Sequence, residues 1–451
     1  MYTEVIGRRL LKTWQRRTGE VATPRAFFEQ TYYPLFLADS RMLQWVTNSP
    51  FAQGGKAVNA EIRPAQLQRL HELLAQATAP NGPGIDASLA PGFPAAGTTA
   101  TTAGQVSDLA PRMGPDAGYC AWMGAAAGIG VAGGLSLALG EEEILWALLE
   151  GWPHYRALLT ARPEMKGNQI ETWNGQWLAH RFGPAYNPAQ PMKGFPVEEI
   201  LVQQPGGLAL STHSWVGLLL RLAPHLPDTT AYVYSLGQTN RTVGFVPLHL
   251  RELRTLPDIA QRLFTLDGTG EHWQKLSTAY ETRLGLGRAC EAGSLGLVAL
   301  EPARLRNALA VVAGPPKNPA QALQHETHKL WLTAMLHNTT QPAALAAPAG
   351  PSGKQITEAA ERLAEGLLKY AAHEPGKSKG RGKTKYAQLV QGVFVPGRPA
   401  FIRQLTELLE ATPASAEYRG LFLDTVQLTQ ELSGASFTLF QALLKFRYTA
   451  G

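Results

Sequence analysis

The chain contains 451 residues, is 45% hydrophobic and carries a formal net charge of +6. This length and composition indicate a soluble globular protein with two or three domains, because such a chain can bury several cores. Its two cysteines, Cys120 and Cys290, lie far apart in sequence. That spacing excludes a disulfide framework and favours a reduced, cytoplasmic protein. The basic N-terminus has no following apolar run and cleavage site, so we expect no secretory signal.

Two helices are predicted at the start of the chain. Residues 2–17 carry apolar side chains at helical spacing, which is typical of an amphipathic helix. Thr23 followed by Pro24 has the form of an N-cap with proline in the first turn, so a second helix is expected there. The following segment to residue 46 is rich in aromatic residues: Phe27, Phe28, Tyr32, Tyr33, Phe36 and Trp45. Such side chains can stack on bases, but their spacing favours a core.

The next segments alternate between loop and helix. Residues 48–56 form a polar, glycine-bearing loop, and a helix is expected over 64–77. Residues 79–118 are rich in Pro, Gly, Ala and Thr. This composition predicts either a long functional loop or a partly disordered insertion.

Residues 119–139 form an uncharged stretch that is long enough to cross a bilayer. Ala and Gly dominate it, however, and three glutamates follow at once. We therefore expect a buried, closely packed core segment, with a membrane-associated protein as an alternative. Gly128, Gly130 and Gly133 also have the G-x-G-x-x-G spacing of dinucleotide-binding folds. Because no β-branched strand precedes them, close helix packing is the favoured interpretation.

A polar segment follows at residues 162–194, where amides and aromatic residues lie among Gly and Pro. This mixture predicts a polar surface rather than a core. The amide side chains in question are Asn168, Gln169, Asn174 and Gln176.

The clearest strand signals lie in residues 197–254. A strand is expected over 200–203, a helix over 214–222, and a hairpin from 231–235 and 243–248. The predicted tip places Gln238, Asn240 and Arg241 together in solvent. Such side chains can read base edges or hold phosphate, although Asn and Gly also favour an ordinary turn.

The chain is predicted to be helical from residue 257 onward. The expected helices are 257–265, 271–286, 302–312, 319–336, 355–372, 399–411, 415–432 and 436–448. The last 130 or so residues therefore have the length and periodicity of a four- or five-helix bundle.

Positive charge is clustered in two places. Near the N-terminus the cluster comprises Arg8, Arg9, Lys12, Arg16 and Arg17. The second cluster lies among Gly, Ser and Thr and comprises Lys377, Lys379, Arg381, Lys383 and Lys385. A basic loop can neutralise phosphates without fixed geometry, whereas the alternative interpretation is a solvated linker.

Catalytic motifs give only weak signals. His325, Glu326 and His328 lack the three-residue gap of the H-E-x-x-H zinc motif, so a surface helix is favoured over a metal site. Neither cysteine has an obvious histidine partner. We therefore expect no catalytic residue, no bound metal and no cofactor.

One enzyme alternative stays open. Asp116 with Glu164 and Lys166 is similar to the acid, acid, lysine arrangement of restriction-type nucleases, in which carboxylates hold magnesium. Its separation in sequence is long, and Glu164 lies between a proline and a glycine rather than in a strand.

Taken together, these features resemble the large subunit of the CRISPR type I interference complex, Cascade. The resemblance lies in the amide-rich segments 168–176 and 238–241, the basic loop at 377–385 and a C-terminal bundle ending in FTLFQALLKFRY. It implies a non-catalytic protein that recognises a short motif beside a DNA target. It also implies that the protein binds guide RNA, contacts other subunits and helps to recruit a helicase-nuclease.

The predicted fold class is α+β and mainly helical, with a small antiparallel sheet in a mixed N-terminal domain. Three regions are expected: 1–255 for nucleic-acid recognition, a helical connecting region at 256–337, and a helical bundle at 338–451 with its basic loop at 373–385. Motif readout needs a few rigid amides or arginines at a duplex edge, while affinity comes from Lys and Arg on phosphates.

Overall fold

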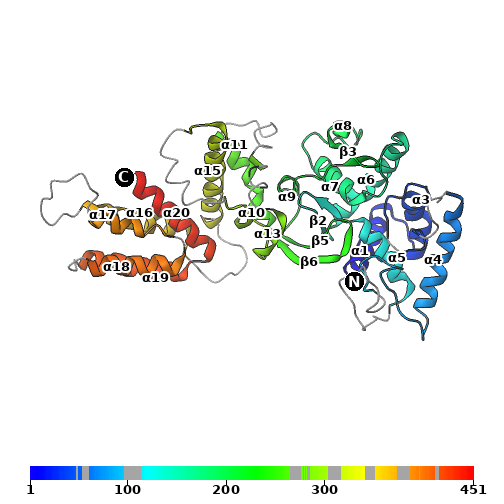
Figure 1. The fold of residues 1–451 in the computed structure, drawn as a ribbon, viewed down its shortest axis with the longest axis horizontal. Helices are drawn as coiled ribbons and strands as arrows, with labels where there is room; N and C mark the ends of the chain where they lie inside the picture. The colour runs from blue at the N-terminus through cyan, green and yellow to red at the C-terminus, as the bar shows by residue number, and fades with distance from the viewer. Residues whose placement is uncertain are drawn as a thin grey trace. The chain divides into compact units, whose positions relative to one another are not determined.

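The computed structural model describes residues 1–46, 49–52, 60–95, 113–264, 276–277, 279, 281, 285–302, 316–340, 351–372, 385–395, 397–411 and 416–450. The chain divides into two compact units. Unit 1 comprises Met1–Arg254 and Gly285–Gly296, and unit 2 comprises Thr255–Leu284 and Leu297–Gly451. The predicted α+β, mainly helical fold is confirmed (Figure 1). The region 256–337, predicted to be a connection, contributes to both units.

Unit 1 combines helices with two antiparallel sheets. Its helical segments are α1 (Tyr2–Thr18), α2 (Pro24–Phe27), the π-helix η1 (Phe28–Tyr32), α3 (Tyr33–Phe36), the 3₁₀ turn η3 (Ala60–Ile62), α4 (Arg63–Ala77), α5 (Pro115–Ala126), α6 (Glu142–Ala161), α7 (Ile170–Arg181), α8 (Val197–Ile200), α9 (Trp215–Leu222), α10 (Leu250–Arg254) and α13 (Leu286–Glu291). Its strands are β1 (Ile129–Val131), β2 (Leu135–Ala138), β3 (Leu201–Gln204), β4 (Gly207–Leu210), β5 (Thr229–Ser235) and β6 (Gln238–Leu248).

The main sheet has the strand order β1-β2-β5-β6, and neighbouring strands are antiparallel. Ala231 and Val233 of β5 are fully buried on one face of this sheet. On the opposite face, Ala138 of β2 lies beside Tyr232 of β5, and Tyr232 lies beside Phe245 of β6. Directly opposed residues of antiparallel strands project to the same face, so these three residues form one row across the sheet.

The uncharged stretch 119–139 is buried, as the sequence predicts, except at the turn 132–135, and it is not helical throughout. Its first part completes α5, and its second part forms the β1–β2 hairpin. Gly128 and Gly130 therefore belong to a strand region rather than to the start of a nucleotide-binding helix. Among the residues that the structure describes, no helix combines the length and the apolar composition of a membrane span.

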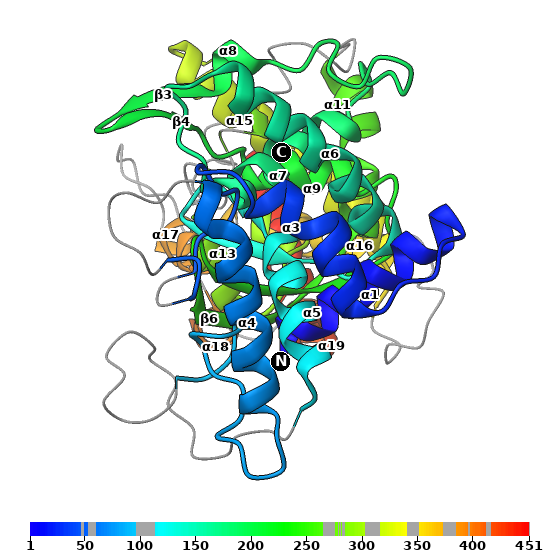
Figure 2. The same cartoon turned by 90° about the vertical axis from the view of Figure 1, so that its right-hand side faces the viewer.

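Close helix packing occurs where α1 crosses α5, and Figures 1 and 2 show the two helices side by side. A Cβ atom on Gly7 of α1 would overlap the carbonyl oxygen of Cys120, and one on Gly124 of α5 would overlap the carbonyl oxygen of Thr3. Glycine on both helices lets the two backbones touch, because neither residue interposes a side chain. This contact fixes α1 against the rest of unit 1.

The predicted second helix begins as expected but is shorter and less regular. Thr23 caps it by accepting a hydrogen bond from the amide of Ala26 at 3.2 Å. It then passes through η1 into α3 and ends at Phe36. Pro34 explains the irregularity, because it has no N–H for the regular helical bond. The core interpretation is confirmed for four of the aromatic residues in this segment: Phe27, Phe28, Tyr32 and Phe36.

Unit 2 contains described helices only: α11 (Leu256–Phe264), the 3₁₀ turn η4 (Val298–Leu300), α15 (Pro319–Thr340), α16 (Gly353–Ala372), α17 (Lys385–Gly392), α18 (Arg398–Ala411), α19 (Ala416–Glu431) and α20 (Gly434–Ala450). Helix α16 packs against α17, α19 and α20, and α18 packs against α17 and α19. This arrangement confirms the predicted C-terminal bundle. Helix α17 was not among the expected helices, and its first residue, Lys385, was predicted to belong to the basic loop.

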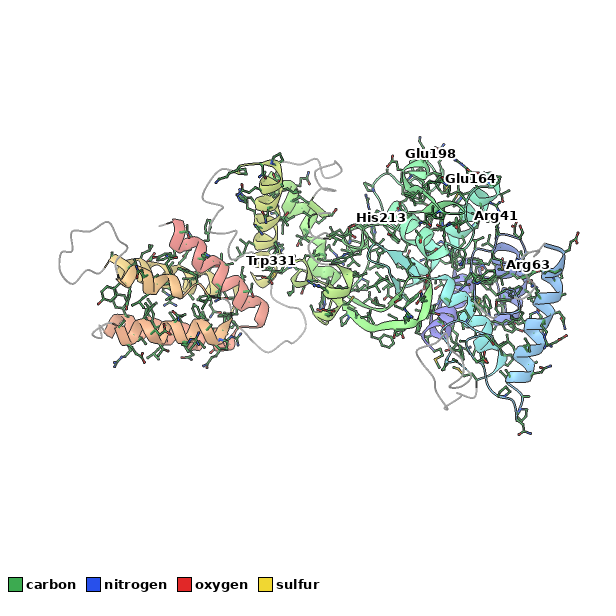
Figure 3. The ribbon with its side chains drawn as sticks, in the orientation of Figure 1. Arg41, Arg63, Glu164, Glu198, His213 and Trp331 are labelled. Atoms are coloured by element: carbon green, nitrogen blue, oxygen red, sulfur yellow. The ribbon has the colours of Figure 1, made fainter. Side chains whose placement is uncertain are left out.

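One prediction in unit 2 is wrong and two lie largely outside the described residues. His325 and His328 are buried on α15, where a surface helix was expected, because this face of α15 is turned into the core beside Trp331 (labelled in Figure 3). The helices expected over 271–286 and 302–312 fall mainly on residues that the structure does not describe.

Candidate nucleic-acid interface

Three aromatic rings meet on the sheet face that α1 crosses. Tyr232 and Phe245 are opposite each other on β5 and β6, and their ring centroids lie 4.9 Å apart at an interplanar angle of 71°. Tyr2, from the first turn of α1, stacks on Tyr232 with a centroid distance of 3.8 Å. Helix α1 therefore packs on Tyr232 through Tyr2, whereas Phe245 lies on the edge strand β6.

A second contact of α1 lies just beyond the end of β2. Ala138, the last residue of β2, pairs with Tyr232, and Gly140 follows two residues later. A Cβ atom on Gly140 would overlap the guanidinium of Arg9. Helix α1 therefore contacts the sheet through Tyr2 and the segment that follows β2 through Arg9. The exposed flank of that segment carries Val5, Arg9 and Lys12.

We define the α1–β6 surface by six of the exposed side chains of these two elements: Val5, Arg9, Lys12, Arg241, Val243 and Phe245. Phe245 is 72% exposed and Val243 is 50% exposed. Among the described residues, Arg9, Lys12 and Arg241 form no salt bridge. The surface thus combines unpaired cations with an exposed aromatic ring.

The other cations of the N-terminal cluster are already paired with acidic groups. Arg8 binds Glu4, one helical turn away on α1. At the C-terminal end of α1, Arg16 lies 2.8 Å from Glu142, and Arg17 binds both Glu142 and Glu143 of α6. These pairs join α1 to α6. The basic cluster at residues 8–17 therefore contains three arginines that form salt bridges and two cations, Arg9 and Lys12, that form none within the described residues. The sequence alone does not distinguish the two groups.

The predicted hairpin exists, but its tip is displaced from the predicted position. A two-residue turn at Leu236 and Gly237 joins the strands, and Gly237 has φ of +72°, a conformation that suits glycine. Gln238 pairs with Ser235, so it belongs to β6 rather than to the tip. The polar residues predicted at the tip, Gln238, Asn240 and Arg241, therefore lie on strand β6.

The three residues after Gln238 form a bulge. Tyr234 pairs with Thr242 and Ser235 pairs with Gln238, which leaves 239–241 without partners on β5. Gln238 and Arg241 are exposed. Asn240 lies in the bulge, and its side chain is outside the described set. The structure therefore brings Gln238 and Arg241 to one exposed edge of the sheet, beside the aromatic row.

A partly buried carboxylate holds this turn in place. Glu171, in the first turn of α7, accepts hydrogen bonds from the Tyr234 hydroxyl at 2.6 Å and from the Gly237 amide at 2.7 Å. Burial raises the pKa of Glu171, while these two bonds oppose the shift. The Tyr2 hydroxyl adds a contact to the carbonyl of Thr239 at 3.4 Å. Sequence reasoning missed Glu171, because nothing local links it to a turn 66 residues away.

The predicted polar surface at residues 168–176 is wrong for Asn174 and Gln176. Helix α7 is buried from Thr172 to His180, and Asn174 is completely enclosed. The Asn174 amide donates to the carbonyls of Ala126 and Gly128 at 2.8 and 2.7 Å, and its oxygen accepts from Trp152 at 3.1 Å. Polar side chains can occupy a core when their hydrogen bonds are satisfied in this way.

Gln176 has a similar internal role. Its amide donates to the carbonyl of Ser211 at 2.8 Å, and its oxygen lies 3.2 Å from Nδ1 of His213, which Figure 3 labels. Burial, with a further contribution from nearby Arg221, lowers the pKa of His213 to about 4. The imidazole is therefore neutral at physiological pH and suits a hydrogen-bonded core.

The remaining two amides lie at the start of α7. Gln169 is engaged on both sides, since it accepts from the Leu210 amide at 2.6 Å and donates to the carbonyl of Lys166 at 2.8 Å. Asn168 is exposed, and its oxygen accepts from the amide of Trp45 at 2.6 Å. Of the four predicted amides, Asn168 alone presents a largely exposed side chain.

The residues of the nuclease alternative lie on different elements. Asp116 is in the first turn of α5. The backbones of Glu164 (labelled in Figure 3) and Lys166 pair with Leu208 of β4. The Glu164 carboxylate lies 3.8 Å from the guanidinium of Arg162. In the part of the chain that the structure describes, no three His, Cys, Asp or Glu side chains are grouped as metal ligands would be. Burial also raises the pKa of the Cys120 thiol to about 12 and that of Cys290 to about 11.

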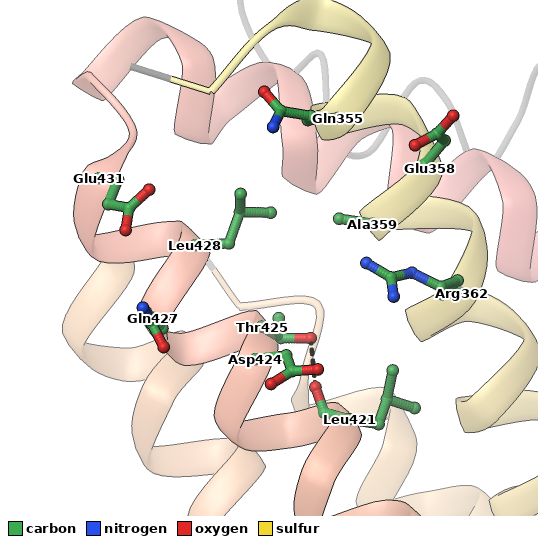
Figure 4. A pocket seen from close by; sticks show the side chains of 10 residues that line it. All are labelled: Gln355, Glu358, Ala359, Arg362, Leu421, Asp424, Thr425, Gln427, Leu428 and Glu431. Atoms are coloured by element: carbon green, nitrogen blue, oxygen red, sulfur yellow. Dashed lines mark hydrogen bonds between the residues drawn. The ribbon is translucent and has the colours of Figure 1, made fainter. Parts of the chain in front are cut away.

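Unit 2 contains a groove of about 300 Å³ between α16 and α19 (Figure 4). Its charged lining residues are Glu358, Arg362, Asp424 and Glu431. Three carboxylates against one guanidinium give the groove a negative charge, which disfavours phosphate. The groove is therefore a poor place for a nucleic-acid backbone, whereas the α1–β6 surface is cationic.

Four residues of the predicted basic loop, Lys377, Lys379, Arg381 and Lys383, lie outside the described residues, and Lys385 is the first residue of α17.

Comparison with models of known protein families, with curated proteins and with solved structures found no match.

Proposed function

We propose that this chain binds nucleic acid without catalysing a reaction, as a subunit of an RNA-guided complex that targets DNA. In this proposal the α1–β6 surface contacts the nucleic-acid strand. The proposal is supported above all by Arg9, Lys12 and Arg241, which form no salt bridge within the described part of the chain, together with the exposed apolar and aromatic side chains of β6.

Each cation has a separate role in this proposal. Lys and Arg side chains that neutralise phosphates release counterions, and this release supplies most sequence-independent affinity. Arg9 and Lys12 are held by a helix that is fixed through its glycine contacts, so the charges have a defined position. Arg241 lies in the bulge of β6 and Gln238 directly precedes the bulge, so an arginine and an amide can contact base edges as well as phosphate there.

The family resemblance supplies the larger setting of the proposal. It assigns guide RNA, target DNA and neighbouring subunits as partners, together with a helicase-nuclease that performs the cleavage. The basic loop at residues 377–385 is then a second backbone contact. Readout of the motif beside the target is assigned to Gln238, Asn240 and Arg241, and to Asn168, which is exposed.

The proposal is tested by replacing Arg9, Lys12 and Arg241 together with Gln. We expect weaker binding to oligonucleotides of any sequence, and a slope of log K against log salt that is smaller by about 2–3, because three phosphate contacts are lost. Fluorescence anisotropy at several salt concentrations measures both quantities.

A charge-matched control is available within the same helix. Replacing Arg8, Arg16 and Arg17 with Gln also removes three positive charges, but these side chains are engaged with Glu4, Glu142 and Glu143. We expect a smaller change in the salt slope for this control. Equal effects of the two triple substitutions would mean that only net charge matters, and would contradict an interface at this surface.

A further inference from the structure

Phe245 is the most exposed phenylalanine or tryptophan among the described residues, at 72% of its surface. Fully burying such a side chain is worth about 1.5–3 kcal/mol, so leaving it in water forgoes a substantial stabilisation. The residues beside it on β6 are exposed as well: Val243 is 50% exposed, and Pro247 projects into solvent. An exposed ring in such a row is typical of a binding surface.

The ring has a defined position despite its exposure. Tyr232 holds it through the T-shaped contact across the strands, and Tyr232 is itself fixed by the stacked ring of Tyr2. Tyr232 also lies 6.4 Å from the fully buried Tyr234, measured between ring centroids. Phe245 is thus the open end of an aromatic series that begins in the core, so little conformational freedom is lost when a ligand stacks on it.

The edge of β6 is less suited to a ligand than its face. The pairing of β6 with β5 shifts register twice, once between Val233 and Tyr234 and once between Tyr234 and Ser235. Near its end, Pro247 has no amide hydrogen to donate, and its carbonyl already accepts from Leu295 at 2.8 Å. Bulges and proline are devices that prevent an added strand from pairing at an edge. A ligand of this region is therefore expected on the aromatic face.

We infer that Phe245 stacks against an unpaired base, so the ligand of the α1–β6 surface is a single-stranded stretch of nucleic acid. This inference rests on the proposed function and specifies its ligand class. An aromatic ring beside cations is the usual platform for single strands, because every base has a flat face and the backbone follows the positive charge. The bases of an intact duplex are stacked on one another, which leaves no face for Phe245.

The cations are placed to complete this site. Arg241 precedes Phe245 by four residues on one strand, at most about 13 Å along an extended chain and less across the bulge. Arg9 lies beside Gly140, two residues after Ala138, the residue of β2 that pairs with Tyr232. Arg241 on β6 and Arg9 on α1 therefore offer positive charge to the phosphates of a strand that stacks on Phe245.

The test compares Phe245→Ala with Phe245→Trp in the full-length chain. The ligands are a labelled oligothymidine and a labelled duplex of equal length, and affinities are measured by fluorescence anisotropy at one low salt concentration. We expect Phe245→Ala to weaken single-strand binding roughly 5- to 150-fold, the value of one stacked base. Duplex binding should change less than twofold, and Phe245→Trp should keep single-strand affinity because it retains the aromatic face.

Phe446→Ala is the matched control, since Phe446 is a half-exposed phenylalanine on α20 in unit 2. It should leave both affinities unchanged. Loss of single-strand and duplex affinity to equal extents in Phe245→Ala, or loss of neither, would overturn the stacking inference. A variant that binds DNA normally but no longer binds a protein subunit would also overturn it, because Phe245 would then be a protein contact.

The experiment separates the inference from the proposed function on which it rests. If the unmodified chain binds neither ligand, both are wrong. If it binds with the salt dependence expected of Arg9, Lys12 and Arg241 while Phe245→Ala has no effect, nucleic-acid binding stands and only the stacking role of Phe245 is wrong.

Discussion

Replacing Gly7 with Ala should destabilise unit 1 by about 3 kcal/mol or more, the largest effect that we expect from adding one methyl group. The new Cβ would overlap the carbonyl oxygen of Cys120, and this obstacle is backbone rather than a side chain that can rotate away. Helices α1 and α5 would have to separate. Denaturant titration of the free energy of unfolding measures the loss.

Gly287→Ala is the control for this change. Gly287 is also a helical glycine of unit 1, but it is exposed, and a Cβ built on it meets nothing within 4 Å. Alanine there should be neutral or stabilising by up to about 1 kcal/mol, because it reduces the freedom of the unfolded chain. Equal stabilities for Gly7→Ala and Gly287→Ala would contradict the backbone contact between α1 and α5.

Asn174→Ala should be nearly as damaging, at about 3–5 kcal/mol, although the side chain is polar. The substitution removes the donor for the carbonyls of Ala126 and Gly128 and the acceptor for the indole of Trp152. Each buried group left without its partner costs about 1–3 kcal/mol. The free energy of unfolding and the fluorescence of buried tryptophan both report this loss.

The same substitution at Asn168 provides the comparison. Asn168 is exposed and bonds only the amide of Trp45, so Asn168→Ala should cost about 1 kcal/mol or less. The polar-surface interpretation of residues 168–176 predicts similar small effects at both asparagines. A cost below 1 kcal/mol at Asn174 would therefore restore that interpretation and contradict the buried position of α7.

Local patterns in the sequence predicted much of the fold correctly. The apolar spacing of residues 2–17 gave α1, Thr23 with Pro24 gave the start of α2, and the strand pattern gave the β5–β6 hairpin. These elements are set by neighbouring residues, so a single sequence contains the necessary information. The C-terminal bundle was predictable for the same reason, since its helices follow a clear apolar period.

The errors arose where distant partners decide the outcome. Asn174 resembles a surface residue until the carbonyls of Ala126 and Gly128, 48 and 46 residues away, satisfy its amide. Likewise the bulge in β6 depends on pairing with β5, so the tip was placed too late in the sequence. Long-range pairing of this kind leaves no local signal.

The candidate site was predictable only in part. Arg241 and the basic N-terminal cluster could be found from charge, and Gln238 from its position near a turn. Phe245 could not be found from the sequence. Its ring is positioned by Tyr232, which stacks on Tyr2, a residue 243 positions away from Phe245 in sequence. Nor could the sequence separate Arg9 and Lys12 from the paired arginines, whose partners lie mostly on α6.

Photocrosslinking tests the central claim most directly. The full-length chain is irradiated with a single-stranded oligonucleotide that contains bromouracil, and the crosslinked peptides are identified by mass spectrometry. Nucleic-acid binding at the α1–β6 surface predicts crosslinks at Phe245, Tyr232 and the N-terminal turn of α1, which disappear in the Arg9, Lys12 and Arg241 triple variant. Crosslinks that fall only in unit 2, or that persist unchanged in that variant, would contradict it.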